Sequence, residues 1–357
     1  MTAFEPSGDA LGAMAARGLR EIDPSIQIVG LGGSLMENEK VQLLEHTTKE
    51  AAMGVGAISE IRRIKRLVGV VESWIQEHKP DVVVAVDSPA ANWPVCKVAK
   101  KFGCTVVHLA APQLWAWAPW RIKKMKLLSD HVMCLLPFEE EWFASRGMPA
   151  TFIGHPAMVK HVSNEVQLPA GEPNIVLLPG SRKREIAKNL PMQQEILARI
   201  CAEFSGTEAV IACRGEDVER VKPYCGDMQI VADELPSVLD WADLALNVSG
   251  TVSLHIMQHA TPMIGMYKVN ALSMLGSKIM LNTPNRLLPN VIAGERVVPE
   301  FIPCGNIAGH IATVAIDLLR DTTAMQEMRD RLQKEAAVYD SHNPSNEAAE
   351  IILSFTR

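Results

Sequence analysis

The chain has 357 residues, 48% of them hydrophobic and 21% charged, which is typical of a globular protein long enough for two domains. Its 35 basic and 41 acidic residues give a formal net charge of −6, which argues against a general nucleic-acid binder. No apolar run could span a bilayer, no signal sequence opens the chain, and seven scattered cysteines indicate neither a zinc site nor a disulfide framework. We therefore expect a cytoplasmic protein.

The first half of the chain alternates strand and helix patterns. Only four residues precede the turn Glu5-Pro6-Ser7-Gly8-Asp9, so the first strand of this region is short or missing. A helix is expected at residues 10–19, a long amphipathic helix at 58–78, and strands at 26–31, 81–87, 105–110, 131–135 and 151–153. The strand at 81–87 is apolar and ends in Asp87, at the strand end where open α/β sheets bind ligands. Capping of the turn Ser88-Pro89 is the alternative role for this acid.

Two basic clusters oppose the negative total charge. The first comprises Arg62, Arg63, Lys65 and Arg66 in the long helix. The second, at residues 113–126, combines Trp115, Trp117 and Trp120 with Arg121, Lys123, Lys124 and Lys126. Tryptophan favours interfaces and basic side chains attract anionic head groups, so both clusters are candidates for membrane contact. The alternative is ordinary packing against the core with the charges in water.

A second alternating series follows a polar stretch at residues 155–173 that is rich in Pro and Gly. We predict an N-terminal domain at 1–156, a linker at 157–173, a second domain at 174–340, and a C-terminal helix in 341–357 that returns to the first domain. In the second domain, strands are expected at 175–178, 208–213, 228–231, 244–247 and 262–267. The pattern predicts an α/β protein of two Rossmann-like, doubly wound domains that face each other across a cleft.

Two turns of the second domain have the composition of a phosphate cradle. One is Pro179-Gly180-Ser181-Arg182, and the other is Ser249-Gly250-Thr251. Small residues at a helix start let an anion approach the backbone, and a guanidinium can bind two phosphate oxygens. Either turn alone could be ordinary helix capping, but the pair favours a diphosphate site. The sequence contains no P-loop motif and no dinucleotide-binding Gly-x-Gly-x-x-Gly.

An ordered set of motifs resembles the lipid A disaccharide synthase family, which consists of GT-B glycosyltransferases. The motifs are Glu5-Pro6-Ser7-Gly8-Asp9, Met53-Gly54, Asp87-Ser88-Pro89 with Asn92, Trp115-Ala116-Trp117, Leu136-Pro137-Phe138-Glu139, Phe152-Ile153-Gly154-His155-Pro156, Leu178-Pro179-Gly180-Ser181-Arg182, Ser249-Gly250-Thr251 and Leu288-Pro289-Asn290. The resemblance implies transfer of 2,3-diacylglucosamine from its UDP-sugar to 2,3-diacylglucosamine 1-phosphate. The products would be a β-1,6 disaccharide, formed with inversion, and UDP. The family needs no metal, and no cofactor is implied.

The resemblance also implies roles for single residues. Asp87 would be the general base for the acceptor hydroxyl, and Arg182 would offset the charge on the departing UDP. The implied substrate contacts are Ser7, Gly8, Asn92, Gly180, Ser181, Ser249, Gly250, Thr251, His255 and Asn290. A lipid acceptor favours peripheral contact with the cytoplasmic face of the inner membrane, through Arg62, Arg63, Lys65, Arg66, Trp115, Trp117, Trp120 and Arg121. A homo-oligomer is left open.

Two departures from the family pattern concern the substrates. Ala91 replaces a second acid after Asp87, and His255 stands where the family has a glutamate. In related enzymes that glutamate accepts hydrogen bonds from the ribose, whereas a neutral imidazole brings no negative charge. Two alternatives therefore stay open: a GT-B transferase or epimerase that acts on another UDP-sugar, and a non-catalytic relative that binds a nucleotide sugar.

Overall fold

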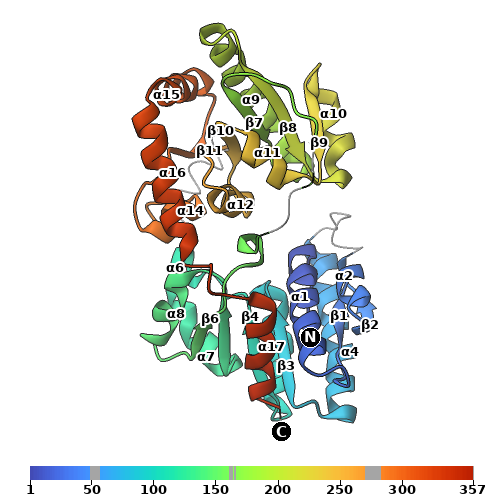
Figure 1. Cartoon of the computed structure of the whole chain (residues 1–357). Coiled ribbons are helices and arrows are strands. Elements are labelled where there is room, and N and C mark those ends of the chain that lie inside the picture. The colour runs from blue at the N-terminus through green and yellow to red at the C-terminus, as the bar shows by residue number, and fades with distance from the viewer. Residues whose placement is uncertain (49–56, 161–163, 165, 270–282, 357) are drawn as a thin grey trace. The chain divides into compact units, whose positions relative to one another are not determined.

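The computed structural model describes residues 1–48, 57–160, 164, 166–269 and 283–356 (Figure 1). The motif Met53-Gly54 lies outside the described residues. The chain divides into two compact units, which we call unit 1 (Met1–Pro156 with Ser341–Arg357) and unit 2 (Ala157–Asp340). None of the helices in the described residues combines the length and apolar character that crossing a membrane requires.

Unit 1 is built from a parallel sheet with helices on both faces. Its strands are β1 (Val29–Gly32), β2 (Gln42–His46), β3 (Val82–Val86), β4 (Thr105–Leu109), β5 (His131–Cys134) and β6 (Ala150–Phe152). Its helices are α1 (Pro6–Ile22), α2 (Ser34–Asn38), α4 (Ala57–His78), α5 (Pro89–Lys101), α6 (Leu114–Trp117), the short 3-10 helix η1 (Pro119–Arg121), α7 (Ile122–Leu128), α8 (Pro137–Ala144) and α17 (Pro344–Ser354).

Among the described residues, one bridging residue joins the two halves of this sheet. Thr2 forms parallel bridges with Leu31 of β1 and with Ala85 of β3. The Thr2 amide donates to Val84 O at 2.9 Å, and the Val86 amide donates to Thr2 O at 3.0 Å. The strand order is therefore β2, β1, the Thr2 bridge, β3, β4, β5 and β6, and the expected short first strand is this bridge. The doubly wound order reverses between the Thr2 bridge and β3, which we call the switch point of unit 1.

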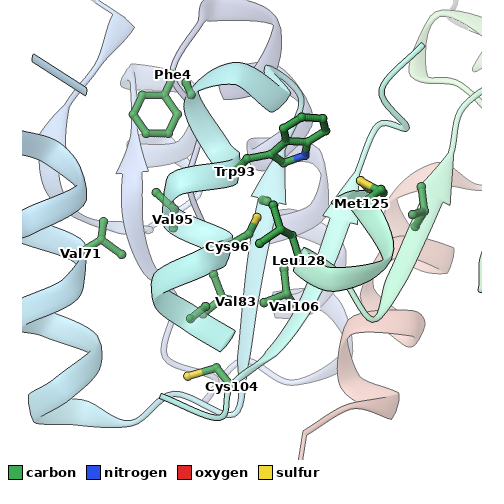
Figure 2. Close-up of a cluster of buried hydrophobic side chains, with 14 of the residues drawn as sticks. Phe4, Val71, Val83, Trp93, Val95, Cys96, Cys104, Val106, Met125 and Leu128 are labelled. Carbon is green, nitrogen blue, oxygen red and sulfur yellow. The ribbon is translucent and has the colours of Figure 1, made fainter. Parts of the chain in front are cut away.

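The strands of unit 1 are apolar throughout because both faces of the sheet are covered. On one face, Val83 of β3 and Val106 of β4 pack against Trp93 of α5 and Met125 of α7 (Figure 2). On the other face, Val84 and Val86 belong to a cluster with α1 and α17. Helix α17 lies directly against α1 (Figure 1), so the C-terminal residues complete the core of the N-terminal unit.

Unit 2 contains one six-stranded parallel sheet. Its strands are β7 (Asn174–Leu178), β8 (Glu208–Cys213), β9 (Gln229–Ala232), β10 (Leu244–Val248), β11 (Met263–Lys268) and β12 (Glu300–Cys304). Its helices are α9 (Lys183–Glu203), α10 (Val218–Cys225), α11 (Leu235–Trp241), α12 (Val252–Gln258), α14 (Leu288–Ala293), α15 (Ala308–Arg320) and α16 (Thr322–Ala337), with the 3-10 turns η2 (Pro156–Met158) and η3 (Gly215–Asp217). The order β12-β11-β10-β7-β8-β9 reverses between β7 and β10, which is the switch point of unit 2.

The structure adds two strands that the apolar pattern does not reveal, β2 and β12. Both lie at the edge of their sheet. None of the residues in β2 is fully buried, and β12 contains a charged residue, Glu300, and a proline, Pro303, with its three central residues partly exposed. An edge strand needs less apolar surface than a central one, so its sequence gives a weaker signal.

Candidate active site

The turn after β3 places Asp87 at the switch point of unit 1. Asp87 and Ser88 both have left-handed backbone angles, with φ of 53° and 37°. Such angles are unfavourable for residues with a side chain and persist only when neighbouring contacts hold them. The Asp87 side chain itself is only partly buried. The strained backbone of this turn therefore orients the Asp87 carboxylate at the end of β3.

Asn92 of α5 holds this strained turn. Its amide nitrogen donates to the carbonyls of Val86 and Asp87, both at 2.8 Å, and its oxygen accepts from the Thr2 hydroxyl at 2.7 Å. The side chain has no exposed surface. Protein groups thus occupy the Asn92 amide, and the substrate contact through Asn92 stays a prediction. Its role is to position Asp87.

Ser7 meets Asp87 from the other side of the switch point. Its hydroxyl lies in the first turn of α1 and donates to Asp87 Oδ2 at 2.9 Å. Gly8 follows, buried against β3: a Cβ at this position would lie 3.3 Å from Val86 O. Ser7 is thus placed beside the carboxylate as a site residue requires, whereas Gly8 lets α1 approach the sheet.

Asp9, which the motif also contains, has a scaffolding role that sequence reasoning missed. It is 3% exposed and accepts from the amides of Gly33 at 2.7 Å and of Leu35 and Met36 at 3.1 Å each. A carboxylate that receives the first amides of a helix stabilises its start. Asp9 therefore fixes α2 to α1.

His108 is a further polar residue near Asp87 that the apolar pattern of β4 conceals. It is fully buried opposite Ala85, and neither ring nitrogen has a hydrogen-bond partner among the described residues. Burial lowers the pKa of His108 to about 4, although the nearby Asp87 carboxylate acts in the opposite direction. The imidazole is therefore neutral at physiological pH and adds no positive charge beside Asp87.

The two predicted phosphate turns come together at the switch point of unit 2. Strands β7 and β10 are adjacent and parallel, with Leu178 opposite Asn247, so the turns that follow them lie side by side. Gly180 has φ of 95°, and a Cβ there would lie 2.9 Å from Glu185 Oε2 and 3.5 Å from Val248 Cγ1. Only glycine fits this position without displacing its neighbours.

Cationic side chains surround the turn after β7. Arg182 begins α9, and its side chain is 81% exposed while its Nη1 pairs with Glu185 Oε1 at 2.9 Å. Arg220 of α10 donates to Ser181 O at 3.3 Å and pairs with Asp217, a buried acid that also binds Arg214. The Arg214, Asp217, Arg220 spacing of three residues could have suggested this cluster from the sequence.

The turn after β10 presents small polar residues. Ser249 is partly buried, and Gly250 and Thr251 are exposed at the start of α12. Gly250 O accepts from the Ser253 hydroxyl at 2.7 Å, which orders the turn. His255 is half-buried on α12, one turn after Thr251. Exposed amides, hydroxyls and a cation next to one another can bind a diphosphate.

Comparison with known proteins identifies the family. The family model described as Lipid-A-disaccharide synthetase matches residues 1–354. The chain belongs to the lipid-A-disaccharide synthase family. The lipid-A-disaccharide synthase of Granulibacter bethesdensis is 30% identical over 98% of this chain and 94% of its own length. The lipid-A-disaccharide synthase of Coxiella burnetii is 28% identical over 99% of this chain and 96% of its own length.

Solved structures agree on the fold of this lipid-A-disaccharide synthase family member. The glycotransferase of kitacinnamycin superimposes with a TM-score of 0.66 at 12% identity, covering 100% of this chain and 98% of that one. The predicted α/β fold of two Rossmann-like domains, the GT-B type, is confirmed.

Asn290, for which the family motif implies a substrate contact, has a structural role in α14. It is fully buried in α14, and its oxygen accepts from the amides of Val297 at 2.8 Å and Val298 at 3.0 Å. Its amide group donates to Val298 O at 2.9 Å and to Glu300 Oε2 at 3.1 Å. Asn290 therefore ties α14 to β12.

The basic residues of α4 differ in their availability. The Arg63 side chain is 9% exposed, pairs with Glu60, and donates to Thr47 O at 3.0 Å, so it offers little surface for the predicted membrane contact. Arg66 pairs with Glu45 at 2.5 Å. Arg62 and Lys65 are exposed.

The tryptophans of the second basic cluster also differ. Trp115 is partly buried, and its indole donates to the buried carboxylate of Glu139 at 2.9 Å, which makes it structural. Trp117 lies under the Arg121 guanidinium at 4.4 Å. Trp120 is 67% exposed, and Leu127 of α7 is 74% exposed. The exposed part of this cluster is therefore η1 and α7, not the Trp115 helix.

Proposed function

We propose that the protein transfers 2,3-diacylglucosamine from its UDP-sugar to the 6-hydroxyl of 2,3-diacylglucosamine 1-phosphate, forming the β-1,6 disaccharide and releasing UDP. Membership of the lipid-A-disaccharide synthase family supports this reaction. The observation that carries the assignment of roles is the partly exposed Asp87 carboxylate, aimed by a strained turn and held at one oxygen by Ser7.

The chemistry follows from the two switch points. Asp87 accepts the proton of the acceptor hydroxyl as its oxygen attacks the anomeric carbon of the donor. The bond between that carbon and the diphosphate oxygen breaks, and its electron pair leaves with UDP. Arg182 and the amides of the Gly180 and Gly250 turns offset the charge that grows on the diphosphate. Attack from the face opposite the leaving group inverts the anomeric centre, and Asp87 later releases its proton to water.

A lipid acceptor requires access to a membrane surface. We propose that Trp120 and Leu127 enter the cytoplasmic face of the inner membrane while Arg121, Lys123 and Lys124 contact anionic head groups. The exposed apolar side chains beside cations on η1 and α7 support this surface, and Arg62 and Lys65 of α4 add charge.

The decisive experiment measures UDP release with acylated donor and acceptor. The proposal predicts UDP and disaccharide in equal amounts, and neither when the acceptor is omitted. Conversion of the UDP-sugar without acceptor would favour an epimerase, and binding without any conversion would favour a non-catalytic relative. Co-sedimentation with vesicles of anionic phospholipid tests the membrane contact: Trp120→Ala with Leu127→Ala should reduce binding, whereas Trp241→Ala, a tryptophan of unit 2, should not.

A further inference from the structure

The carboxylate of Glu185 lies inside the turn that we assign to the donor diphosphate. Glu185 is the third residue of α9, and its side chain is 11% exposed. Its Oε2 accepts from the Arg182 amide at 3.2 Å, and its Oε1 accepts from Arg182 Nη1 at 2.9 Å. The Tyr267 hydroxyl donates to the same Oε1 at 3.4 Å. An acid at an anion site needs an explanation, because its charge repels the ligand.

The two oxygens of Glu185 have separate tasks. Oε2 receives the backbone amide of Arg182, which is the ordinary stabilisation of a helix start. Among the described residues, Oε1 accepts from no backbone amide and accepts instead from the Arg182 guanidinium and the Tyr267 phenol. Helix capping therefore accounts for one oxygen only, and the other is directed at the side chain that we assign to the diphosphate.

The carboxylate is fixed from two directions. The turn is shaped around it, since a Cβ at Gly180 would lie 2.9 Å from Oε2. Tyr267 belongs to the end of β11, two strands away from β7, and the neighbouring Lys268 amide donates to Asn189 of α9 at 2.8 Å. Burial, followed by the Glu185 carboxylate, raises the pKa of Tyr267, so the phenol keeps its proton and remains a donor.

A fixed acceptor matters because the Arg182 side chain is long, flexible and 81% exposed. An arginine loses side-chain entropy when a ligand orders it, and that loss weakens binding. A pair with a rigid carboxylate makes part of that ordering before the ligand arrives. A guanidinium carries five N–H donors, more than one carboxylate oxygen accepts, so the pair does not exclude phosphate.

We propose that Glu185 is the positioning residue of the donor site: with Tyr267 behind it, it presents the Arg182 guanidinium to the diphosphate of the UDP-sugar. This inference rests on the proposed function, in which Arg182 contacts that diphosphate. It predicts that Glu185 and Tyr267 act only through Arg182.

The test is a double-mutant cycle on the full chain with acylated substrates. Glu185→Gln should lower kcat/KM for the donor by about tenfold, and Tyr267→Phe should lower it by about fivefold. Both substitutions should raise the donor KM and leave the acceptor KM unchanged. In an Arg182→Ala background neither substitution should lower kcat/KM further. Arg184→Ala, which removes an exposed cation from the same helical turn, is the matched control and should behave as the parent.

The outcomes separate this inference from the proposed function. If Arg182→Ala lowers kcat/KM about 100-fold while Glu185→Gln and Tyr267→Phe change nothing, the inference is wrong and the function stands. If both substitutions lower kcat/KM as much in the Arg182→Ala background as in the parent, they act through the fold, and the inference is also wrong. If Arg182→Ala itself has no effect, the assigned donor site fails. Tyr267→Phe leaves the helix cap intact, so it decides the matter even if Glu185→Gln destabilises α9.

Discussion

The switch points of the two units share a topology and differ in what they offer a substrate. In unit 1 the turn after β3 contributes an acid whose side chain meets Ser7 across the reversal of strand order. In unit 2 the turns after β7 and β10 contribute glycine and hydroxyl residues, with Arg182 beside them. One arrangement suits removal of a proton and the other suits an anion. The same fold supports both because the residues after the strands, not the strands, determine the chemistry.

The units also differ in how they obtain an unusual backbone. Asp87 and Ser88 adopt left-handed angles although each has a side chain, which costs on the order of 1–3 kcal/mol per residue. Gly180 adopts φ of 95° without that cost. In unit 1 the turn must carry a carboxylate side chain, and Asn92 supports the strained backbone that this requires. In unit 2 an anion must approach the backbone, so the turn has a glycine, which has no side chain.

The largest effect is expected from Asp87→Asn. The amide preserves shape and cannot take the acceptor proton, so kcat should fall about 1000-fold while UDP affinity is unchanged. Single-turnover kinetics and calorimetric titration with UDP measure the two quantities. Asp81→Asn, an exposed acid at the start of the same strand region, is the control and should retain full turnover. A similar loss of UDP affinity would mean that Asp87 belongs to the donor site.

Gly180→Ala in unit 2 should have its main effect on UDP affinity, which Asp87→Asn leaves unchanged. The added methyl lies 2.9 Å from Glu185 Oε2 at a residue with φ of 95°, so either the Glu185 carboxylate or the turn must shift. UDP affinity and kcat/KM should therefore fall by up to about 100-fold. Gly226→Ala isolates the cost of the backbone angle, because Gly226 also has a positive φ, of 57°, with no atom within 4 Å of its Cβ position. Equal behaviour of the two variants in UDP titrations would contradict the assigned cradle.

Asn92→Ala should weaken unit 1 in particular. It removes the donors to the Val86 and Asp87 carbonyls, and the free energy of unfolding should fall by about 2–3 kcal/mol. Urea denaturation followed by tryptophan fluorescence is suited to this unit, because Trp241 is the only one of the seven tryptophans in unit 2. Asn92→Asp keeps the acceptor for Thr2 and loses the donated bonds. If it were as stable as the parent, the carbonyl contacts would not matter.

The smallest effect concerns pH and the Glu139 carboxylate. Burial raises the pKa of Glu139 from 4.5 to about 7, against the opposing hydrogen bonds from Trp115, Leu136 and Leu135. The folded state therefore binds this proton more tightly, and the stability that Glu139 contributes falls as pH rises from 4.5 to above 7. Glu139→Gln lacks this dependence. The unfolding free energy of the variant minus that of the parent should rise by about 1 kcal/mol between pH 6 and pH 8, measured by urea denaturation. A constant difference would show that Glu139 is ionised at pH 6.

The sequence predicts the central strands and the turns that follow them well, because their signals are local. The run at β3 is apolar in every residue, and the small residues around Gly180 stand next to Arg182 in the chain. Burial of a polar residue depends on distant partners and has no local signal. The Asn92 side chain accepts a hydrogen bond from Thr2, 90 positions away, and the Arg63 side chain donates one to the Thr47 carbonyl, 16 positions away. Glu185 and Tyr267, 82 positions apart, meet only because β11 and β7 belong to one sheet.

The Thr2 bridge has a consequence for how motion spreads through unit 1. In the part of the chain that the structure describes, the β1–β2 pair and the four strands from β3 to β6 are connected in the sheet through Thr2 and the backbone bonds next to it. A connection so narrow is a natural line of local opening, at which one half of the sheet can loosen without the other. Ser7 leaves the sheet from this line and Asp87 leaves it from the adjoining strand. The hydrogen bond between Ser7 and Asp87 therefore links the two halves of the sheet. A substrate that contacts both side chains would stabilise this link.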